Sequence, residues 1–304
     1  MLSPEQRQHL LACPKDPVDI VMDTDAYNEI DDQFAISYAL RARNRLYVRA
    51  FYAAPFLNGR SESPLDGMEK SYSEIHKLLH LAKEERPVFK GSDRYLKSEK
   101  EAVDSPAARD LIKRAPAYSA DKPLYVVGIG AITNVASALL MAPEIADRIV
   151  VIWLGGHSLN WHDTHEFNMS QDVAAARVLY ASGSPLVILP CMGVVSALTT
   201  TEPELRHWLS GKNALSDYLV TQTIDEANTY AAGRVWSRVI WDAATIAWLL
   251  NERGDLLLDR LIPTPIPEYD YHYGFDPRRP FCKYVYHINR DAVFADLFEK
   301  LSAE

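Results

Sequence analysis

The residues most able to do chemistry are acidic and lie close together in residues 23–34, DTDAYNEIDDQF. Four aspartates fall within ten positions, with Glu29 between them (Asp23, Asp25, Asp31 and Asp32). Neighbouring carboxylates raise one another's pKa values unless a cation or hydrogen bonds hold them. Because these ligands are all hard oxygens, a bound ion is expected to be Ca²⁺ or Mg²⁺ rather than Zn²⁺. The alternative is a hydrated acidic turn that caps a helix.

The elements around this acidic segment favour the metal site. The apolar run 18–22 precedes it and predicts a buried strand. An amphipathic helix is predicted to follow, from the spacing of its apolar residues (Ile30, Phe34, Ala35, Tyr38 and Ala39). Open α/β sheets bind ligands where strands end and helices begin, so the turn is placed where a site is expected.

Further apolar runs alternate with helical segments along the chain. Strands are predicted at 46–54, 123–128, 149–154 and 185–189, and helices at 68–83, 172–182 and 291–301, with a helical pattern through 202–250. This alternation predicts an α/β fold, with a mostly parallel, Rossmann-like sheet flanked by helices, in a single domain over residues 1–304. The Pro- and Tyr-rich segment 263–281 is expected to be extended chain or an edge strand.

Polar residues follow several of these predicted strands. They are Asn58, Thr133 and the loop NWHDTHEFN, residues 160–168. In a parallel sheet the carboxyl ends of the strands share one edge, so residues more than a hundred positions apart can meet in one cleft with the acidic turn.

Composition excludes several classes of partner. The 304 residues are 48% hydrophobic and carry a net charge of −9, which argues against binding to a nucleic-acid backbone. Apolar runs stay below the roughly 18 residues needed to cross a bilayer, and the first residues lack a signal-peptide pattern, so a cytoplasmic location is expected. Cys13, Cys191 and Cys282 are isolated, which predicts reduced thiols.

Five segments together resemble the nucleoside hydrolase family, in the same order and over most of the chain. They are DTDAYNEIDDQFA, GAITNVA, LGG, EFNMSQDVAAARVLYASGSPLVILP and VIWDAATIAWLL. The resemblance implies a Rossmann-like fold, one Ca²⁺ ion at the sheet edge, and hydrolysis of the N-glycosidic bond of ribonucleosides.

Carried over by position, the resemblance also implies roles for individual residues. Asp25 would activate water and contact the metal, Asp32 and Asp242 would chelate it, and Thr133 would offer its backbone carbonyl. The sugar hydroxyls and nearby substrate atoms would be bound by a second group (Asp31, Asn58, Asn160, Glu166 and Asn168), with Asp23 as a supporting carboxylate.

The chain departs from the family pattern at positions that affect the substrate. Five residues, 26–30, separate Asp25 from Asp31 where the family usually has three. Met192 replaces the usual Asp after the strand 185–189. Trp241 replaces a His that, in purine-active members of the family, can protonate the leaving base. An indole N–H cannot act as a general acid. Other donors are therefore candidates (His162, His165, His272, Arg234 and Tyr230), while Trp161, Trp236 and Trp241 could stack on a base or sugar.

Three functions remain open at this point. The first is a calcium-dependent hydrolase of a ribonucleoside or ribose-like glycoside. The second acts on a different, non-nucleoside sugar. The third is a non-catalytic, calcium-dependent sugar or nucleoside binder, which the presence of Asp25 disfavours. A homodimer or homotetramer is possible in each case.

Overall fold

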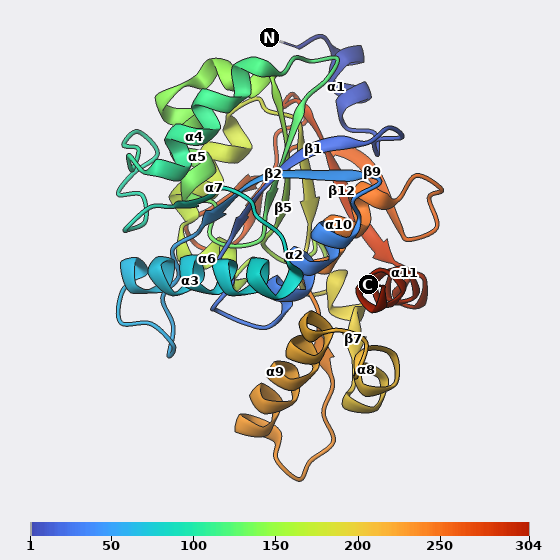
Figure 1. The fold of residues 1–304 in the computed structure, drawn as a ribbon. Coiled ribbons are helices and arrows are strands. Elements are labelled where there is room, and N and C mark those ends of the chain that lie inside the picture. The colour runs from blue at the N-terminus through green and yellow to red at the C-terminus, as the bar shows by residue number, and fades with distance from the viewer. Residues whose placement is uncertain (1, 304) are drawn as a thin grey trace.

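The central sheet fixes the position of every element around it (Figure 1). In the computed structural model, which describes residues 2–303, eight strands form this sheet in the order β3-β2-β1-β4-β5-β6-β12-β9. Their bounds are β1 (Val18–Thr24), β2 (Leu46–Ala53), β3 (Val88–Lys90), β4 (Leu124–Gly128), β5 (Ile149–Leu154), β6 (Leu186–Leu189), β9 (Leu257–Pro263) and β12 (Phe281–Ile288). Neighbouring strands are parallel except β9, which runs antiparallel to β12 at one edge. The predicted mostly parallel sheet is confirmed.

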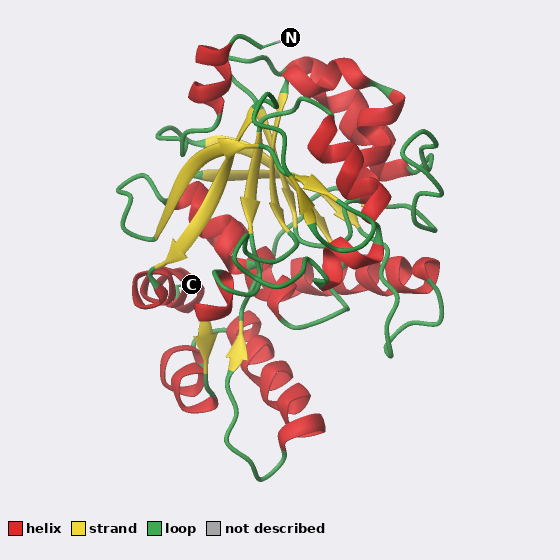
Figure 2. Cartoon of the chain, turned by 180° about the vertical axis from the view of Figure 1, so that it is seen from behind, coloured by secondary structure: helices red, strands yellow, loops and turns green. Residues whose placement is uncertain are grey.

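Helices cover both faces of the sheet, as Figure 2 shows from behind. On one face are α2 (Asp31–Arg41), α3 (Pro64–Ala82), α10 (Ala243–Leu250) and α11 (Arg290–Ser302); on the other are α4 (Pro106–Arg114), α5 (Thr133–Met141) and α7 (Val173–Ala181). The strand residues alternate accordingly, since Ile20 and Met22 join the first apolar cluster and Val21 joins the second. Shorter elements complete the body: α1 (Pro4–Leu10), α6 (Phe167–Gln171), η1 (Ala115–Ala117), η2 (Pro143–Asp147) and η3 (Val195–Ala197).

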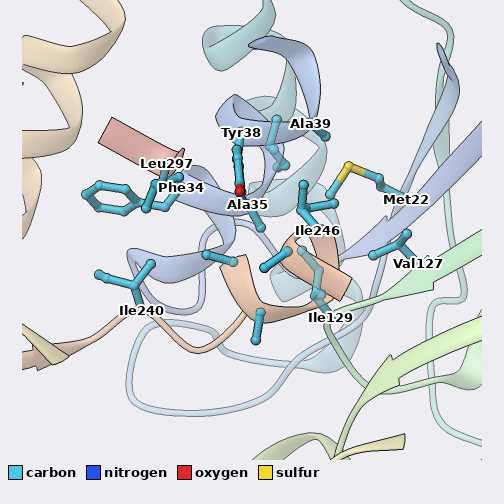
Figure 3. Packing of buried hydrophobic residues seen from close by; sticks show 14 of the residues in the cluster. Met22, Phe34, Ala35, Tyr38, Ala39, Val127, Ile129, Ile240, Ile246 and Leu297 are labelled. Carbon is cyan, nitrogen blue, oxygen red and sulfur yellow. The ribbon is translucent and has the colours of Figure 1, made fainter. Parts of the chain in front are cut away.

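Helix α2 is buried along almost its whole length, from Asp31 to Leu40. Phe34 and Tyr38 pack among Met22 of β1, Ile246 of α10 and Leu297 of α11 (Figure 3). Each large apolar side chain buried in this way contributes about 1.5–3 kcal/mol to stability. Because the core holds α2 on all sides, the acidic first turn of this helix has a fixed position.

The segment 202–250, predicted to be helical, is interrupted. Helices α8 (Glu202–Leu209) and α9 (Ala214–Ala231) project from the body, joined to it by the strand pair β7 (Thr199–Thr200) and β8 (Arg238–Val239) (Figures 1 and 2). The chain then enters α10.

The C-terminal part differs from expectation in one respect. The segment 263–281 contains a short antiparallel pair, β10 (Ile266–Pro267) and β11 (Tyr273–Gly274), whereas the longer strands β9 and β12 that flank it were not predicted. Within residues 2–303, no helix combines the length and apolar character that a bilayer crossing requires.

Candidate active site

Three separate segments bring aspartates to one cavity of about 270 Å³. Asp25 lies in the turn after β1, Asp31 and Asp32 form the first turn of α2, and Asp242 directly precedes α10. The order of strands reverses between β1 and β4, since β2 lies on one side of β1 and β4 on the other. A ligand crevice is expected at this switch point of an open α/β sheet, and the cavity lies there.

The carboxylates in the cavity are close together and shielded from solvent. One oxygen each from Asp31, Asp32 and Asp242 lies within 4.8 Å of the others. The exposed fraction of these residues is 4%, 2% and 2%, and that of Asp25 is 1%. Thr24 donates a hydrogen bond to Oδ1 of Asp32, which fixes one of these carboxylates. The positive end of the α2 dipole also favours acidic groups in its first turn.

Burial and mutual repulsion penalise ionisation of these carboxylates. Burial, then the charges of Asp32 and Asp31, raises the pKa of Asp25 well above its ordinary value. Burial and the charge of Glu29 raise the pKa of Asp31 to about 7. Both carboxylate oxygens of Asp25 and Oδ1 of Asp31 are buried without a hydrogen-bond partner within residues 2–303. A hard divalent cation would satisfy these oxygens and remove the repulsion, so the residues fit Ca²⁺ or Mg²⁺.

Gly130, in the turn after β4, allows Asp25 to lie against the backbone. A Cβ atom at this position would be 2.8 Å from Oδ1 of Asp25. Any larger residue would therefore displace the carboxylate.

Thr133, whose backbone carbonyl was predicted to bind the metal, is not among the residues that line the cavity. Its hydroxyl donates a 2.7 Å hydrogen bond to Oδ2 of Asp172, and it begins α5 behind the carboxylates. The residue of this segment that lines the cavity is Ile129, the first after β4. Asp23 is also behind the cavity, where Asn134 donates a 2.7 Å hydrogen bond to its Oδ1.

Glu166 and Asn168 both line the cavity, but their side chains are engaged differently. The carboxylate of Glu166 accepts three backbone N–H groups at 2.9 Å, from Gly156, Asn168 and Met169, and so links the turn after β5 to α6. Asn168 donates through Nδ2 to the carbonyl of Leu154 at 3.1 Å. Its Oδ1 makes no hydrogen bond within the described residues and is available to a ligand hydroxyl.

Asn58 reaches the cavity only through another residue. The backbone N–H of Arg60 donates to Oδ1 of Asn58 at 2.8 Å, so Nδ2 must be the other end of this amide. That Nδ2 donates to Oδ1 of Asn28 at 2.5 Å. Asn28 lines the cavity, and this chain of bonds leaves its Nδ2 as the free donor. Asn28, rather than Asn58, therefore presents its amide to the cavity, and Asn58 orients it.

Glu29, in the same inserted segment, is paired with a cation. Nη2 of Arg238, on β8, lies 2.6 Å from Glu29 and 3.9 Å from Asp31, and Nη1 lies 3.2 Å from Glu226 on α9. The side chain of Arg238 is only 14% exposed. It offsets part of the negative charge at the cavity and ties the inserted segment to the projecting helices.

Aromatic and histidine side chains complete the wall. Trp241, Met192, His165 and His157 line the cavity. Asn160, predicted to bind substrate, is exposed and lies outside the cavity lining, because the loop after β5 turns toward solvent there. The candidate donors His162 and His272 are outside it as well.

Two of the lining residues that can form hydrogen bonds, Asn28 and His157, were not found from the sequence. Asn28 belongs to the inserted segment 26–30, whose unusual length was the available signal. His157 directly follows the Gly155-Gly156 turn at the end of β5, so the rule that sites form at strand ends could have identified it.

Sequence comparisons relate the chain to a known family. Residues 20–271 match the family model described as inosine-uridine preferring nucleoside hydrolase. The chain is 31% identical over 156 residues to the pyrimidine-specific ribonucleoside hydrolase RihA of Salmonella enteritidis PT4, a match that covers 49% of each chain. The chain thus spans about half the length of the curated relatives it matches.

Solved structures share the fold over nearly the whole length. A plant nucleoside hydrolase, PpNRh1, has a TM-score of 0.74 at 19% identity, covering 95% of this chain and 100% of its own. A purine-preferring ribonucleoside hydrolase from Gardnerella vaginalis has the same TM-score and identity, covering 93% and 98%. At these identities the likeness concerns the fold.

Proposed function

The chain belongs to the inosine-uridine preferring nucleoside hydrolase family, and on this premise we propose that it is a calcium-dependent hydrolase of the N-glycosidic bond in a ribonucleoside or ribose-like glycoside. The observation that carries the proposal is the buried cluster of aspartates, with unpartnered oxygens, at the switch point of the sheet. The proposal covers the substrate, the ion and the roles of individual residues.

The cation is proposed to be held by Asp25, Asp32 and Asp242. Asp31 lies within 4.8 Å of Asp32 and Asp242 and could share in binding, and Asp25 lines the same cavity. These are hard oxygen ligands, and calcium accepts six to eight of them. When bound, the ion would hold two neighbouring sugar hydroxyls and make a nearby water a better nucleophile.

Asp25 is proposed as the group that accepts the proton of the attacking water. Its two oxygens have no other partner among residues 2–303, so they are free to accept this proton. Cleavage of a glycosidic bond passes through an oxocarbenium-like state. The surrounding carboxylates favour that positive charge.

The sugar is proposed to be oriented by two side-chain amides, one of which accepts a hydrogen bond while the other donates one. Oδ1 of Asn168 would accept a bond from a hydroxyl, and Nδ2 of Asn28 would donate one. Asp31 would accept from a further hydroxyl. Trp241 offers a flat ring to the base or to the sugar face.

The test combines ion content with turnover. Calcium is measured in the purified protein, followed by hydrolysis of p-nitrophenyl riboside, inosine and uridine, in wild type and in Asp25→Asn. We expect bound calcium, turnover of a riboside, and a loss in Asp25→Asn that affects kcat much more than ribose affinity. Ribose binding without any turnover would instead identify a binding protein, and undiminished activity of Asp25→Asn would refute the role of this residue.

A further inference from the structure

In the proposed function, the aspartates bind the sugar and activate the water, but they do not stabilise the departing base. As the C1′–N bond breaks, its electron pair moves onto the base, and a hydrogen-bond donor aimed at the base stabilises that charge. Trp241 cannot transfer a proton. The donor must therefore be another residue of the cavity lining, with an N–H group whose orientation is fixed.

His157 has such a fixed direction. The backbone N–H of Met192 donates to its Nδ1 at 3.3 Å. A nitrogen that accepts this bond carries no proton, so the neutral ring holds its proton on Nε2. Nε2 makes no hydrogen bond within residues 2–303, and Oδ1 of Asp163 is 4.0 Å away, beyond hydrogen-bond distance.

The surroundings keep this ring neutral. His157 is 9% exposed, and its burial lowers its pKa below the ordinary 6.5, against the opposing charge of Asp163. The nearby rings of His162 and His165 lower it further. Protonation of Nδ1 would also set two donors against each other, since the Met192 N–H points at that atom. His157 is thus a neutral donor at pH 7.

His165 is a weaker candidate. It also lines the cavity, but it is exposed to solvent, and its ring packs against Tyr271 with centroids 4.4 Å apart. No backbone group within the described residues fixes which of its nitrogens carries the proton. Water would compete for any hydrogen bond that it made to a base.

We infer that Nε2–H of His157 is the hydrogen-bond donor to the leaving base. This rests on the proposed function. The water oxygen bonds to C1′, its proton passes to Asp25, and the C1′–N bond breaks with its electron pair on the base. His157 donates a hydrogen bond to an acceptor beside the glycosidic nitrogen, such as the O2 of a pyrimidine or N3 of a purine, and keeps its proton. The base takes up a proton from solvent on release.

Two substitutions separate the functions of the two ring nitrogens. In His157→Asn, the side-chain oxygen can still accept from Met192, but the Nε2 donor is lost. In His157→Gln, the longer side chain can place an N–H near the former Nε2. Both variants are assayed with inosine and uridine, which have poor leaving groups, and with p-nitrophenyl riboside, which needs little assistance. His207→Gln, on the exposed side of α8, is the matched control.

We expect His157→Asn to lose about 10²–10³-fold in kcat on inosine or uridine, as for loss of one donor to developing charge. Turnover of p-nitrophenyl riboside should stay within a few-fold of wild type, and His157→Gln should recover part of the nucleoside activity. An equal loss on all substrates, no loss on any, or the same selective loss in Trp241→Phe instead would overturn the inference. Wild-type protein that hydrolyses none of the three would overturn the proposed function itself.

Thermal unfolding shows whether each variant is folded. Should His157→Asn not fold, His157→Ala is assayed with and without added imidazole, which can occupy the vacated space. Imidazole should then restore nucleoside turnover while changing p-nitrophenyl riboside turnover little. Absence of that selective rescue would count against the inference.

Discussion

Nδ2 of Asn58 donates a 2.5 Å hydrogen bond to Oδ1 of Asn28, and this bond decides which end of the Asn28 amide faces the cavity. The orientation is not arbitrary, because the backbone N–H of Arg60 can only donate and so fixes the oxygen of Asn58. Asn28 thus belongs to the cavity wall, and Asn58 to the layer that supports it.

The first prediction concerns this pair. Asn28→Ala should raise KM for ribosides about 2- to 10-fold, the effect of one hydrogen bond of about 0.5–1.5 kcal/mol, with a smaller change in kcat. Asn58→Ala should raise KM less, since Asn28 remains but can rotate. Steady-state kinetics test both, with the exposed Asn44→Ala as control. A larger effect from Asn58→Ala than from Asn28→Ala would contradict this assignment of roles.

The second prediction concerns the acidic cluster. Asp32→Asn keeps an acceptor for the Thr24 hydroxyl but removes one of the charges that repel each other. In chelator, the variant should unfold a few degrees above wild type, because relief of such repulsion is worth on the order of 1–3 kcal/mol. Added calcium should raise the Tm of wild type and leave that of Asp32→Asn unchanged. Thermal scans with and without calcium measure both effects.

The matched control for that experiment is Asp93→Asn, since Asp93 is half exposed and pairs with Arg94 at the surface. Its Tm should rise with calcium as in wild type. If calcium stabilises Asp32→Asn as strongly as wild type, Asp32 is not a ligand.

The third prediction concerns the side-chain hydroxyl of Thr133. Thr133→Val removes the hydroxyl that donates to Asp172 and leaves a buried carboxylate with one bond fewer. The free energy of unfolding should fall by about 1–3 kcal/mol, with calcium affinity changed less than twofold. Urea unfolding and calorimetric titration with calcium test this. A folded variant with unchanged stability would contradict this supporting role of the Thr133 hydroxyl.

The fourth prediction concerns the ionisation of His157. Since its pKa lies below 6.5 in the folded protein, the unfolded chain binds more protons at this residue between the two pKa values. The contribution of His157 to stability is therefore constant above pH 6.5 and is lost as pH falls below it. Ring NMR signals should titrate with a midpoint under 6.5 and show the Nε2–H tautomer above it. A midpoint above 6.5, or an Nδ1–H tautomer, would contradict the structure.

The parallel strands were predictable because burial on both faces leaves a continuous apolar run. β1, β2, β4, β5 and β6 each match such a run to within two residues. β12, FCKYVYHI, has exposed Phe281, Tyr286 and His287 among buried residues, since it lies next to the edge strand β9. Its sequence therefore shows no continuous apolar run.

The candidate site was predictable in its main members. All of the following line the cavity, as the sequence predicted: Asp25, Asp31, Asp32, Asp242, Glu166, Asn168 and Trp241. Thr133, Asn58 and Asn160 do not. Position after a strand brings a residue to the correct edge of the sheet, but does not decide whether its side chain points into the crevice or into the layer behind it.

The amino-acid sequence by itself determined which ligand types gather at the sheet edge, because the pattern of apolar residues shows where the buried strands end. Only the tertiary structure decided which polar atoms remain free there. Each oxygen or nitrogen has a limited number of hydrogen bonds, and partners distant in the chain use some of them. The backbone N–H of Met192 donates to Nδ1 of His157, and that of Gly156 donates to the carboxylate of Glu166. The backbone N–H of Arg60 donates to Oδ1 of Asn58 and so orients this amide. The polar atoms that these contacts leave without a hydrogen-bond partner are the ones that a substrate can bind.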